Sequence, residues 1–355
     1  AAARRVAEKR PFMIIWNTPL YASVFDIWAR AGIVSAGGWH FENSFFTGRR
    51  PYRYDTLMQG TELAGHISEY YCTKLAGGSA THSGRIIHPQ IGARGQVQRK
   101  LGIVVPEIPA NVRTAQQVQQ AVAKCDPDRA PEIFTYVSDI ERATEQTEAV
   151  VSGLIDSGAT TVTCMCDPIA PAFLTAGMTQ QGYFPEHLVA GTSFIDYDLL
   201  GRLYDKQQWH HAFGVSPLPV LYPVEQNDAA RVWRDVGREG HPCGENGCGN
   251  VWAYFSLMGS ALHLAGPNLN PLTFEQALLT KLPPHNQGGK IATLIKFGPG
   301  DYTAQSDVKE VYWSHTQASP VDGEPGTYVP LNDGRRYQLG SWPGGFTDGI
   351  PVAAS

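Results

Sequence analysis

Five short apolar runs between residues 101 and 215 decide the fold of this chain. They are LGIVV (101–105), IFTYV (133–137), VTCMC (162–166), LVAG (188–191) and AFGV (212–215). Helix-like segments separate them, which gives the order β-α-β-α-β-α-β-α-β. The runs are continuous rather than alternating, as in strands that are buried on both faces of a parallel sheet covered by helices. The sequence therefore predicts an α/β lobe here.

The helix-like segments have recognisable ends. In Thr144–Ser157, apolar residues at i, i+1, i+4 and i+5 spacing form one stripe, namely Val150, Val151, Leu154 and Ile155. Gly158 follows as a left-handed cap, and a second segment begins near Pro171 and ends at Gly182. In such folds small-molecule sites form where loops leave the carboxyl ends of the strands. Function is therefore expected in the loops 106–110, 138–141, 167–171 and 192–196.

Length and composition bound the remaining possibilities. A chain of 355 residues exceeds one usual compact core, so two lobes are expected. The net charge of −5 and the lack of a basic stripe argue against nucleic acid as a partner. No run approaches the roughly 20 apolar residues that span a bilayer. Ala1–Arg10 lacks an apolar signal core, so we expect any secretion signal or lipid anchor to lie outside this sequence.

The chain has six cysteines, and disulfides are expected among them if the protein lies outside the cytosol. Cys243 and Cys248 flank a flexible turn, which favours a disulfide between them over a metal half-site or free thiols. Cys164 and Cys166 lie on one face of a predicted buried strand, where small buried hydrophobes are favoured over a redox pair. For Cys72 and Cys125, near helix ends, the sequence decides no pairing.

The chain opens with part of a second sheet. Phe12–Trp16 reads as a strand, Tyr21–Ala31 as a helix, and Ile33–Ser35 as another strand, before Gly37-Gly38-Trp39-His40. So small a sheet cannot bury both faces. We expect either that residues 220–348 complete it or that strands before residue 1 are missing.

The order of these elements resembles a known family. The features are the Gly37-Gly38 end of a strand, an aromatic-Arg-x-Asp-x-x-x-Gln segment at 52–59, a Gly-Gly-x-Ala loop at 77–80, and then the five-strand lobe. Together they look like the type I periplasmic binding proteins, in the branch of branched-chain amino-acid and amide receptors of ABC importers. The resemblance spans nearly the whole chain as a pattern, without a short diagnostic motif.

This resemblance implies a two-lobed Venus-flytrap fold with parallel sheets flanked by helices. We assign residues 1–62 to a partial amino-terminal lobe, 63–216 to the second lobe, 217–330 to a return to the first, and 331–355 to a hinge recrossing and tail. Three crossings make the hinge in that family, and we place them near Gly60–Leu63, Pro217–Tyr222 and Tyr328–Tyr337. The family begins with further β-α units, so the first lobe is expected to lack its first strands.

The resemblance also implies ligand contacts. Asn17 and Thr18 sit where the resembling proteins bind a ligand carboxylate, aided by helix N–H groups. Trp39 and His40 occupy the next such loop, and Trp39 can stack on a flat or apolar ligand. From the second lobe, Glu107, Asp167 and Ser193 follow the first, third and fourth strands, where an acidic group would suit a ligand ammonium.

Each of these residues also has a structural interpretation. Trp39 can be core or hinge packing, Asn17 and Thr18 can be helix caps, and Asp167 before Pro168 forms a common turn and cap pair. Glu107 has the same alternative. The histidines His82, His88, His210 and His211 are interpreted as solvated or structural rather than as metal ligands. We therefore predict no metal and no cofactor.

Motifs for catalysis are absent from the sequence. It has no Gly-x-Ser-x-Gly elbow, no Gly-x-Gly-x-x-Gly at a helix start, no phosphate loop and no His-Glu-x-x-His. The prediction is an extracytoplasmic solute-binding protein, not an enzyme, that closes on a small amino acid-like or amide-like ligand and delivers it to an ABC importer permease. The alternatives are a secreted structural or self-assembling protein that reuses the fold, and a ligand-sensing subunit.

Overall fold

The computed structural model describes residues 2–16, 22–38, 41–192, 194–226, 228–239, 247–286, 294–345 and 350. The chain divides into two compact units. Unit 1 comprises Ala1–Gly60, Leu221–Ser306 and Pro320–Asp322, and unit 2 comprises Thr61–Val220, Asp307–Ser319 and Gly323–Ser355. No helix within the described ranges combines the length and the apolar character needed to cross a bilayer.

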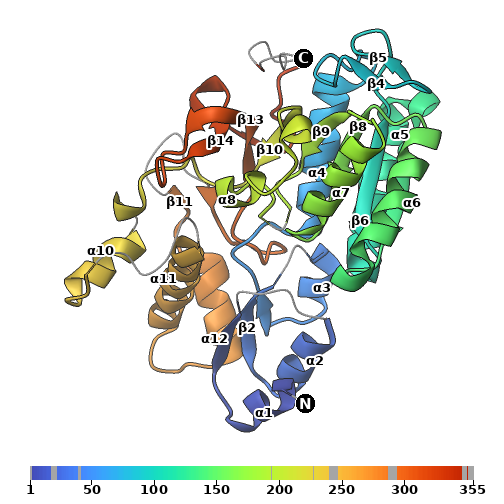
Figure 1. Cartoon of the computed structure of the whole chain (residues 1–355). Helices are drawn as coiled ribbons and strands as arrows, with labels where there is room; N and C mark the ends of the chain where they lie inside the picture. Colours follow the sequence, from blue (N-terminus) through green and yellow to red (C-terminus); the bar gives the residue numbers. More distant parts are fainter. Residues whose placement is uncertain are drawn as a thin grey trace. The chain divides into compact units, whose positions relative to one another are not determined.

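A mostly parallel sheet forms the centre of unit 2 (Figure 1). Its order is β14-β13-β10-β9-β8-β6-β7, and β15 also pairs with β13. The bounds are β6 Leu101–Pro106, β7 Glu132–Tyr136, β8 Thr161–Cys164, β9 Glu186–Val189, β10 Ala212–Ser216, β13 Asp307–Ala318, β14 Pro325–Pro330 and β15 Arg336–Gln338. Strands β6 to β10 run parallel, whereas β13 is antiparallel to β10, β14 and β15. The five apolar runs therefore form the five parallel strands, as predicted.

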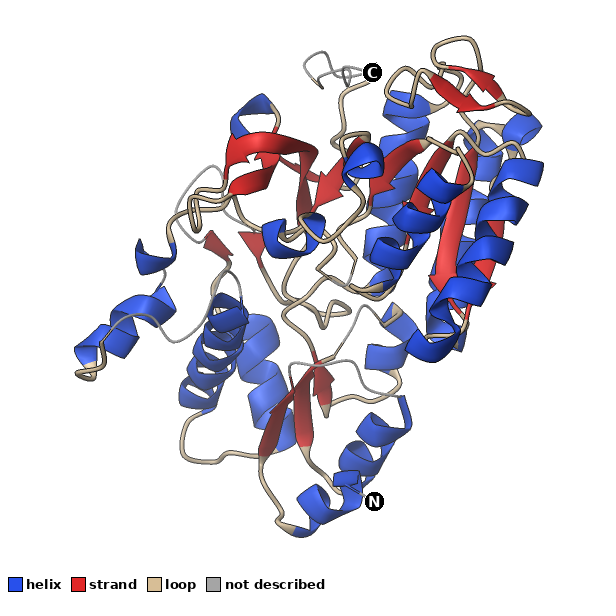
Figure 2. Cartoon of the chain, viewed as in Figure 1, coloured by secondary structure: helices blue, strands red, loops and turns tan. Residues whose placement is uncertain are grey.

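Helices lie on both sides of this sheet (Figure 2). They are α4 Gly60–Tyr70, α5 Pro109–Cys125, α6 Ala143–Asp156, α7 Ala170–Gln180, α8 Asp198–Gly201 and α9 Lys206–Trp209, with a π-helical turn at Tyr71–Leu75 and a small hairpin of β4 Ile86–His88 and β5 Gly92–Ala93. Right-handed crossovers put α5 on one face and both α6 and α7 on the other, because the chain steps along the sheet in opposite directions. The cavity described below lies on the face covered by α6 and α7.

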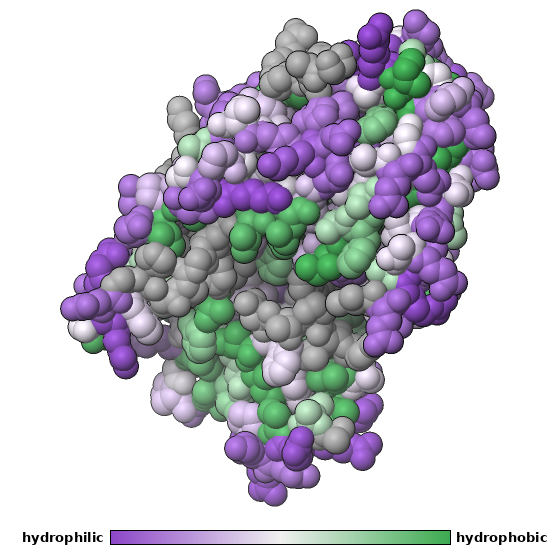
Figure 3. Space-filling model, in the orientation of Figure 1, coloured by the Kyte–Doolittle hydropathy of each residue, from purple (hydrophilic) through white to green (hydrophobic). Residues whose placement is uncertain are grey.

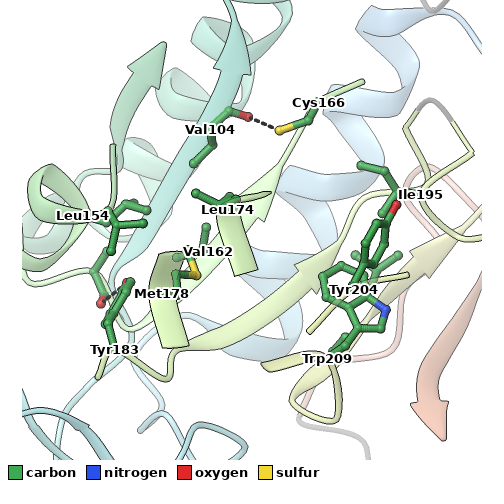
Figure 4. Packing of buried hydrophobic residues seen from close by; sticks show 14 of the residues in the cluster. Val104, Leu154, Val162, Cys166, Leu174, Met178, Tyr183, Ile195, Tyr204 and Trp209 are labelled. Atoms are coloured by element: carbon green, nitrogen blue, oxygen red, sulfur yellow. Dashed lines mark hydrogen bonds between the residues drawn. The ribbon is translucent and has the colours of Figure 1, made fainter. Parts of the chain in front are cut away.

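The apolar stripe of α6 packs into the core of unit 2 as predicted. Val150, Val151, Leu154 and Ile155 are all buried. They meet Val104 and Val162 of the sheet and Leu174 and Met178 of α7 in one cluster (Figure 4). Burial of each such side chain contributes roughly 1.5–3 kcal/mol. Gly102 permits this packing, since a Cβ there would overlap the Leu154 side chain.

Two buried cations, Lys309 and Arg336, hold the chain at the points where it passes between unit 2 and unit 1. Lys309 Nζ donates to Ser216 Oγ at 2.9 Å and to the Leu218 carbonyl at 2.6 Å. Arg336 donates to the same carbonyl at 2.8 Å and pairs with Asp307 at 2.8 Å. In the sequence, Leu218 lies just ahead of the boundary at Val220, and Asp307 is the first residue after the boundary at Ser306. Both ends are therefore anchored to strands of unit 2.

Unit 1 contains a three-stranded parallel sheet in the order β1-β2-β3. Its elements are α1 Ala2–Glu8, β1 Met13–Trp16, α2 Ala22–Arg30, β2 Val34–Gly37, α3 Asn43–Thr47, β3 Arg53–Tyr54, the 3₁₀ turn Val224–Gln226, α10 Asp228–Asp235, α11 Gly247–Ala265, α12 Pro271–Gln276 with a π-helical turn at Ala277–Lys281, and the pair β11 His285–Asn286 and β12 Leu294–Ile295. Aromatic rings fill its core: Phe25 contacts Trp28, Phe41 and Phe45 edge-on.

The chain passes from one unit to the other after Gly60, Val220 and Ser306, and the short segment Pro320–Asp322 is also counted with unit 1. The third differs from the crossing expected near Tyr328–Tyr337. The reason is that β13 begins at Asp307 and pairs with β10, so the chain has already rejoined the sheet of unit 2 by that residue. Consequently the segment 217–330 is divided: residues 221–306 lie in unit 1, whereas β13 and β14 extend the sheet of unit 2.

Candidate functional site

The strand order of unit 2 reverses its direction at β6. From β6 the chain moves to β7 on one side, and later steps run from β8 to β9 and β10 on the other. The loops that follow β6 and β8 therefore turn away from each other, and a crevice is expected between them at the carboxyl ends of the strands. Glu107 follows β6 and Asp167 follows β8, so both predicted acids flank this position.

Asp167 is held by four hydrogen bonds. Its Oδ2 accepts from the Tyr136 hydroxyl at 2.7 Å and from Ser138 Oγ at 3.2 Å. Its Oδ1 accepts from the backbone N–H groups of Ile169 at 3.1 Å and Ala170 at 3.0 Å. A carboxylate has about four acceptor positions, and protein donors occupy all of them. Asp167 thus caps the start of α7, and a ligand ammonium would have to displace one of these donors.

Glu107 is exposed at the end of β6. Its backbone N–H donates to the Tyr136 carbonyl at 2.7 Å, which ties the loop to the end of β7. Among the described residues no side chain pairs with its carboxylate. Glu107 is therefore available to a ligand, whereas the next residue, Ile108, presents an apolar side chain to solvent.

A cavity of about 240 Å³ opens beside Asp167. Its walls come from the carboxyl ends of β6, β7 and β8, the loops after β7 and β8, and the first turns of α6 and α7. Apolar side chains form most of the interior, including Val104, Val150, Phe173 and Leu174. Tyr136 and Asp167 also line it. The arrangement suits a small molecule with an apolar part.

Besides Asp167, two polar side chains of this cavity, those of Gln146 and Tyr136, pair with protein groups. Gln146 of α6 accepts from the Val137 N–H at 2.6 Å and donates to the Val137 carbonyl at 3.1 Å, so it closes the end of β7. The Tyr136 hydroxyl forms two hydrogen bonds: it donates to the Asp167 carboxylate and accepts from the Asp167 backbone N–H. Burial, together with the Asp167 charge, raises the pKa of Tyr136, which keeps the hydroxyl protonated as a donor. These groups shape the cavity rather than offer free partners.

Cys164 and Cys166 form a disulfide in the cavity wall, with Cα atoms 5.0 Å apart. This corrects the expectation of two small buried thiols. The expectation assumed that the strand continues to Cys166, but β8 ends at Cys164, and the chain beyond it bends enough to bring the two sulfurs together. The second pairing, left open by the sequence, is Cys72 with Cys125, which joins the π-helical turn after α4 to the end of α5.

In unit 1, the carboxyl end of β2 abuts a buried cation. The Arg53 guanidinium donates to Asp55 Oδ2 at 3.0 Å and also to the Tyr54 carbonyl, and its carbon lies 4.3 Å from the centre of the Phe25 ring. Gly38, with φ of +110°, lies directly beside it, because an added Cβ would stand 3.0 Å from Arg53 Nη2. Gly38 is therefore required where the chain passes over Arg53.

Several predicted site residues lie outside the described residues, namely Asn17, Thr18, Trp39, His40, Ser193 and Cys243. Cys248 belongs to the first turn of α11, but its side chain is not described. Of the predicted ligand residues, the structure thus places Glu107 and Asp167 at one edge of the sheet. The sequence analysis missed Tyr136 and Gln146; the signal for Tyr136 was its place as the last residue of a strand.

No protein-family model matches the sequence, and no curated protein matches it either. Solved structures match it along nearly its whole length. An ABC transporter substrate-binding protein from Aeropyrum pernix is 12% identical, with a TM-score of 0.61, over 96% of this chain and 81% of that one.

Two further solved structures carry ligands. A solute-binding protein of an ABC transporter from R. palustris, in complex with 4-hydroxybenzoate, is 11% identical over 96% of this chain and 83% of that one, with a TM-score of 0.63. A branched-chain amino acid ABC transporter protein from Thermus thermophilus with bound valine is 12% identical over 90% of this chain and 75% of that one, with a TM-score of 0.60. This chain therefore has the α/β fold of the type I periplasmic binding proteins, which confirms the fold class predicted from its sequence.

Proposed function

We propose that this protein is an extracytoplasmic solute-binding protein that binds a small molecule and delivers it to the permease of an ABC importer. The observation that carries the proposal is the apolar cavity at the position where the strand order of unit 2 reverses. Such positions are the usual ligand sites of open α/β sheets. The similarity to substrate-binding proteins of ABC transporters supports the same function.

The bound solutes of the similar structures suggest the compounds to test. They include complexes with valine, leucine, 4-hydroxybenzoate and 3,4-dihydroxybenzoic acid, and a substrate-binding protein of a fatty acid ABC transporter. These solutes share a carboxylate joined to an apolar body. We infer that the solute of this protein also has an apolar body, because the cavity offers mostly apolar surface. Binding rather than catalysis is proposed, since the side chains of Tyr136, Gln146 and Asp167 in the cavity already form hydrogen bonds with protein groups.

A thermal-shift screen of the chain against amino acids, aromatic acids and fatty acids tests the proposal. A ligand present at about 100 times its Kd should raise the free energy of unfolding by about 3 kcal/mol. Titration calorimetry of the compounds that stabilise the protein should then give one site per chain. Cells that lack the protein should lose uptake of the same labelled compound. A chain that no compound stabilises, and that assembles into large oligomers, would favour the structural alternative.

The same titration tests the residues predicted from the sequence. Alanine variants of Asn17, Thr18, Trp39, His40 and Ser193 remain predicted to weaken binding of the identified solute, as does Glu107→Ala. Each variant should keep the melting temperature of the ligand-free protein. Unchanged affinity in all of them would contradict the predicted contacts.

A further inference from the structure

We propose that unit 1 holds a second ligand site, separate from the cavity of unit 2, in which the free edge of the Arg50 guanidinium binds the carboxylate of a small molecule. The site is a cavity of about 280 Å³ beside α12. It shares no residue with the cavity at Asp167. A ligand bound to Arg50 would therefore not compete with a solute for the residues around Asp167.

The cavity lies at the amino edge of the unit 1 sheet. Arg50 lines it and comes shortly before β3 in the sequence. Phe12, which precedes β1, contacts Phe274 of α12, with ring centroids 5.9 Å apart. The usual ligand sites of open α/β sheets form at the opposite edge, where the strands end. The cavity at Arg50 is therefore a different place from the loops after β1 and β2.

Glu275 holds the Arg50 guanidinium in one orientation. Arg50 Nε and Nη2 each donate to one oxygen of the Glu275 carboxylate, and both bonds are 2.8 Å long. A guanidinium carries five N–H donors in one plane, so three remain, and no described residue accepts from them. Two of these donors, on Nη1 and Nη2, point the same way, which is the arrangement that binds a carboxylate through two parallel bonds. The Arg50 side chain is 52% exposed, so a ligand can reach this edge.

The Tyr302 hydroxyl is a second group without a partner. Tyr302 is only 3% exposed and lines the cavity, yet its hydroxyl bonds to nothing in the part of the chain that the structure describes. The Arg50 guanidinium carbon lies 5.6 Å from the centre of the Tyr302 ring, so both groups can serve one ligand. Buried polar groups nearly always have a hydrogen-bond partner. A ligand oxygen that accepts from Arg50 and from Tyr302 would supply it.

The charges around the cavity favour a single negative charge on the ligand. Of the residues that line it, Arg50 and Glu275 are charged, and they already neutralise each other. Asp301, next to Tyr302, does not line the cavity, and its carboxylate accepts from the Thr303 N–H and hydroxyl at 3.2 Å each. A second negative charge on the ligand would face Glu275 without a second cation. A carboxylate is therefore favoured over a doubly charged phosphate.

The other walls are mixed in character and select size rather than polarity. Leu272, which is 66% exposed, and Pro299 are apolar, whereas Gln276 and Thr280 are polar. Figure 3 likewise shows polar and apolar residues mixed on the surface of unit 1. An apolar cavity of about 150 Å³ in another protein holds benzene, so this cavity holds roughly ten non-hydrogen atoms. The carboxylate, more than the body of the ligand, should decide binding.

Titration of the protein with propionate, followed by NMR, tests the proposal. Propionamide has the same size without the charge and should bind at least about tenfold more weakly, and so should inorganic phosphate. Arg50→Lys keeps the positive charge but removes the planar fork, so it should weaken propionate binding at least about tenfold. Arg231→Lys is the matched control, because Arg231 also pairs with a carboxylate in unit 1 but does not line the cavity. It should leave propionate binding unchanged.

A second variant covers the case in which Arg50→Lys fails to fold. Tyr302→Phe keeps the buried ring and removes only the hydroxyl, so it should weaken propionate binding about three- to tenfold. Tyr312→Phe, outside the cavity, should have no effect. A wild-type protein that does not bind propionate would overturn the proposal. So would propionamide that binds as tightly as propionate, or equal propionate affinity in wild type and in the folded variants at positions 50 and 302.

Discussion

Tyr136 and Asp167 hold each other across the end of β6. The Tyr136 hydroxyl donates to the Asp167 carboxylate at 2.7 Å and accepts from the Asp167 backbone N–H at 3.1 Å. Tyr136 ends β7 and Asp167 follows β8, and β6 lies between these two strands in the sheet. This reciprocal pair therefore fixes the carboxyl edge of the sheet, where the proposed ligand cavity begins.

Tyr136→Phe should lower the free energy of unfolding by about 1–3 kcal/mol, because it removes a hydrogen bond to a charged group and leaves the Asp167 N–H without its acceptor. Urea unfolding followed by circular dichroism measures the change. Tyr312→Phe is the control, since the hydroxyl of the half-buried Tyr312 accepts one long bond of 3.4 Å from an exposed glutamine. Equal stability of the Tyr136 variant and wild type would show that the pair does not hold this edge.

Arg53→Met should destabilise the protein by about 3–5 kcal/mol, because it leaves the buried Asp55 carboxylate without its cation. Arg53 and Asp55 are each 1% exposed, and Asp55 also accepts from Tyr254 at 2.6 Å. The matched substitution Arg231→Met breaks an exposed pair with Asp228, whose side chains are 64% and 62% exposed, and should cost less than about 1 kcal/mol. Chemical denaturation of both variants makes the comparison, and similar losses in the two would contradict the burial argument.

Reduction of the Cys72–Cys125 disulfide should cost about 2–4 kcal/mol, because it releases a loop with a sequence separation of 53 residues. The double variant with serine at both positions reports this loss in urea unfolding. The Cys164–Cys166 disulfide closes a loop with a separation of only 2 residues, so its double serine variant should lose much less through chain entropy. A peptide map that finds Cys72 alkylated in the untreated protein would refute the first bridge.

Two buried histidines should make the protein sensitive to mild acid. Burial lowers the pKa of His187 to about 4 and that of His211 to about 2, in the second case with help from the neighbouring His210 and His187. In the unfolded chain a histidine titrates near pH 6.5, so between about pH 6.5 and 4 only the unfolded state takes up these protons. Stability is therefore complete above pH 6.5 and falls as the pH falls, by roughly 1.4 kcal/mol per pH unit for each histidine.

His187→Asn should lower the slope of the unfolding free energy against pH by the contribution of one histidine, because asparagine does not titrate. Unfolding free energies at a series of pH values between 4 and 7 give the slope for wild type and variant. His263→Asn, on the exposed side of α11, is the control and should keep the wild-type slope. A variant at position 187 with the full wild-type slope would show that the side chain is not buried as a neutral group.

Much of the fold of unit 2 could be predicted because its signals are local. Strands buried on both faces need continuous apolar runs, and the stripe of Val150, Val151, Leu154 and Ile155 needs only helical spacing to be visible. The return of β13 to β10 could not be predicted, since nothing near Asp307 encodes pairing with a strand almost a hundred residues earlier. In the structure the chain rejoins the sheet of unit 2 at Asp307, whereas the crossing was expected near Tyr328–Tyr337.

In the candidate site, too, some features could be predicted from the sequence and others could not. Glu107 and Asp167 were predicted because strand order alone brings the residues after adjacent strands to one edge. The bond between Tyr136 and Asp167, the clamp of Gln146 on Val137 and the disulfide of Cys164 with Cys166 depend on where each strand ends and how the chain bends there. Patterns of residue type leave those ends uncertain by a few residues, which is enough to change the partner of a side chain.

Native mass spectrometry of the protein from its own source, followed by denaturation of the same sample, tests the central claim most directly. The account predicts one small molecule per chain, within the size range of ordinary pocket ligands and with an apolar body, that is released when the protein unfolds. A chain that carries no small molecule, that assembles into large oligomers, and that takes up none of the screened solutes would contradict it.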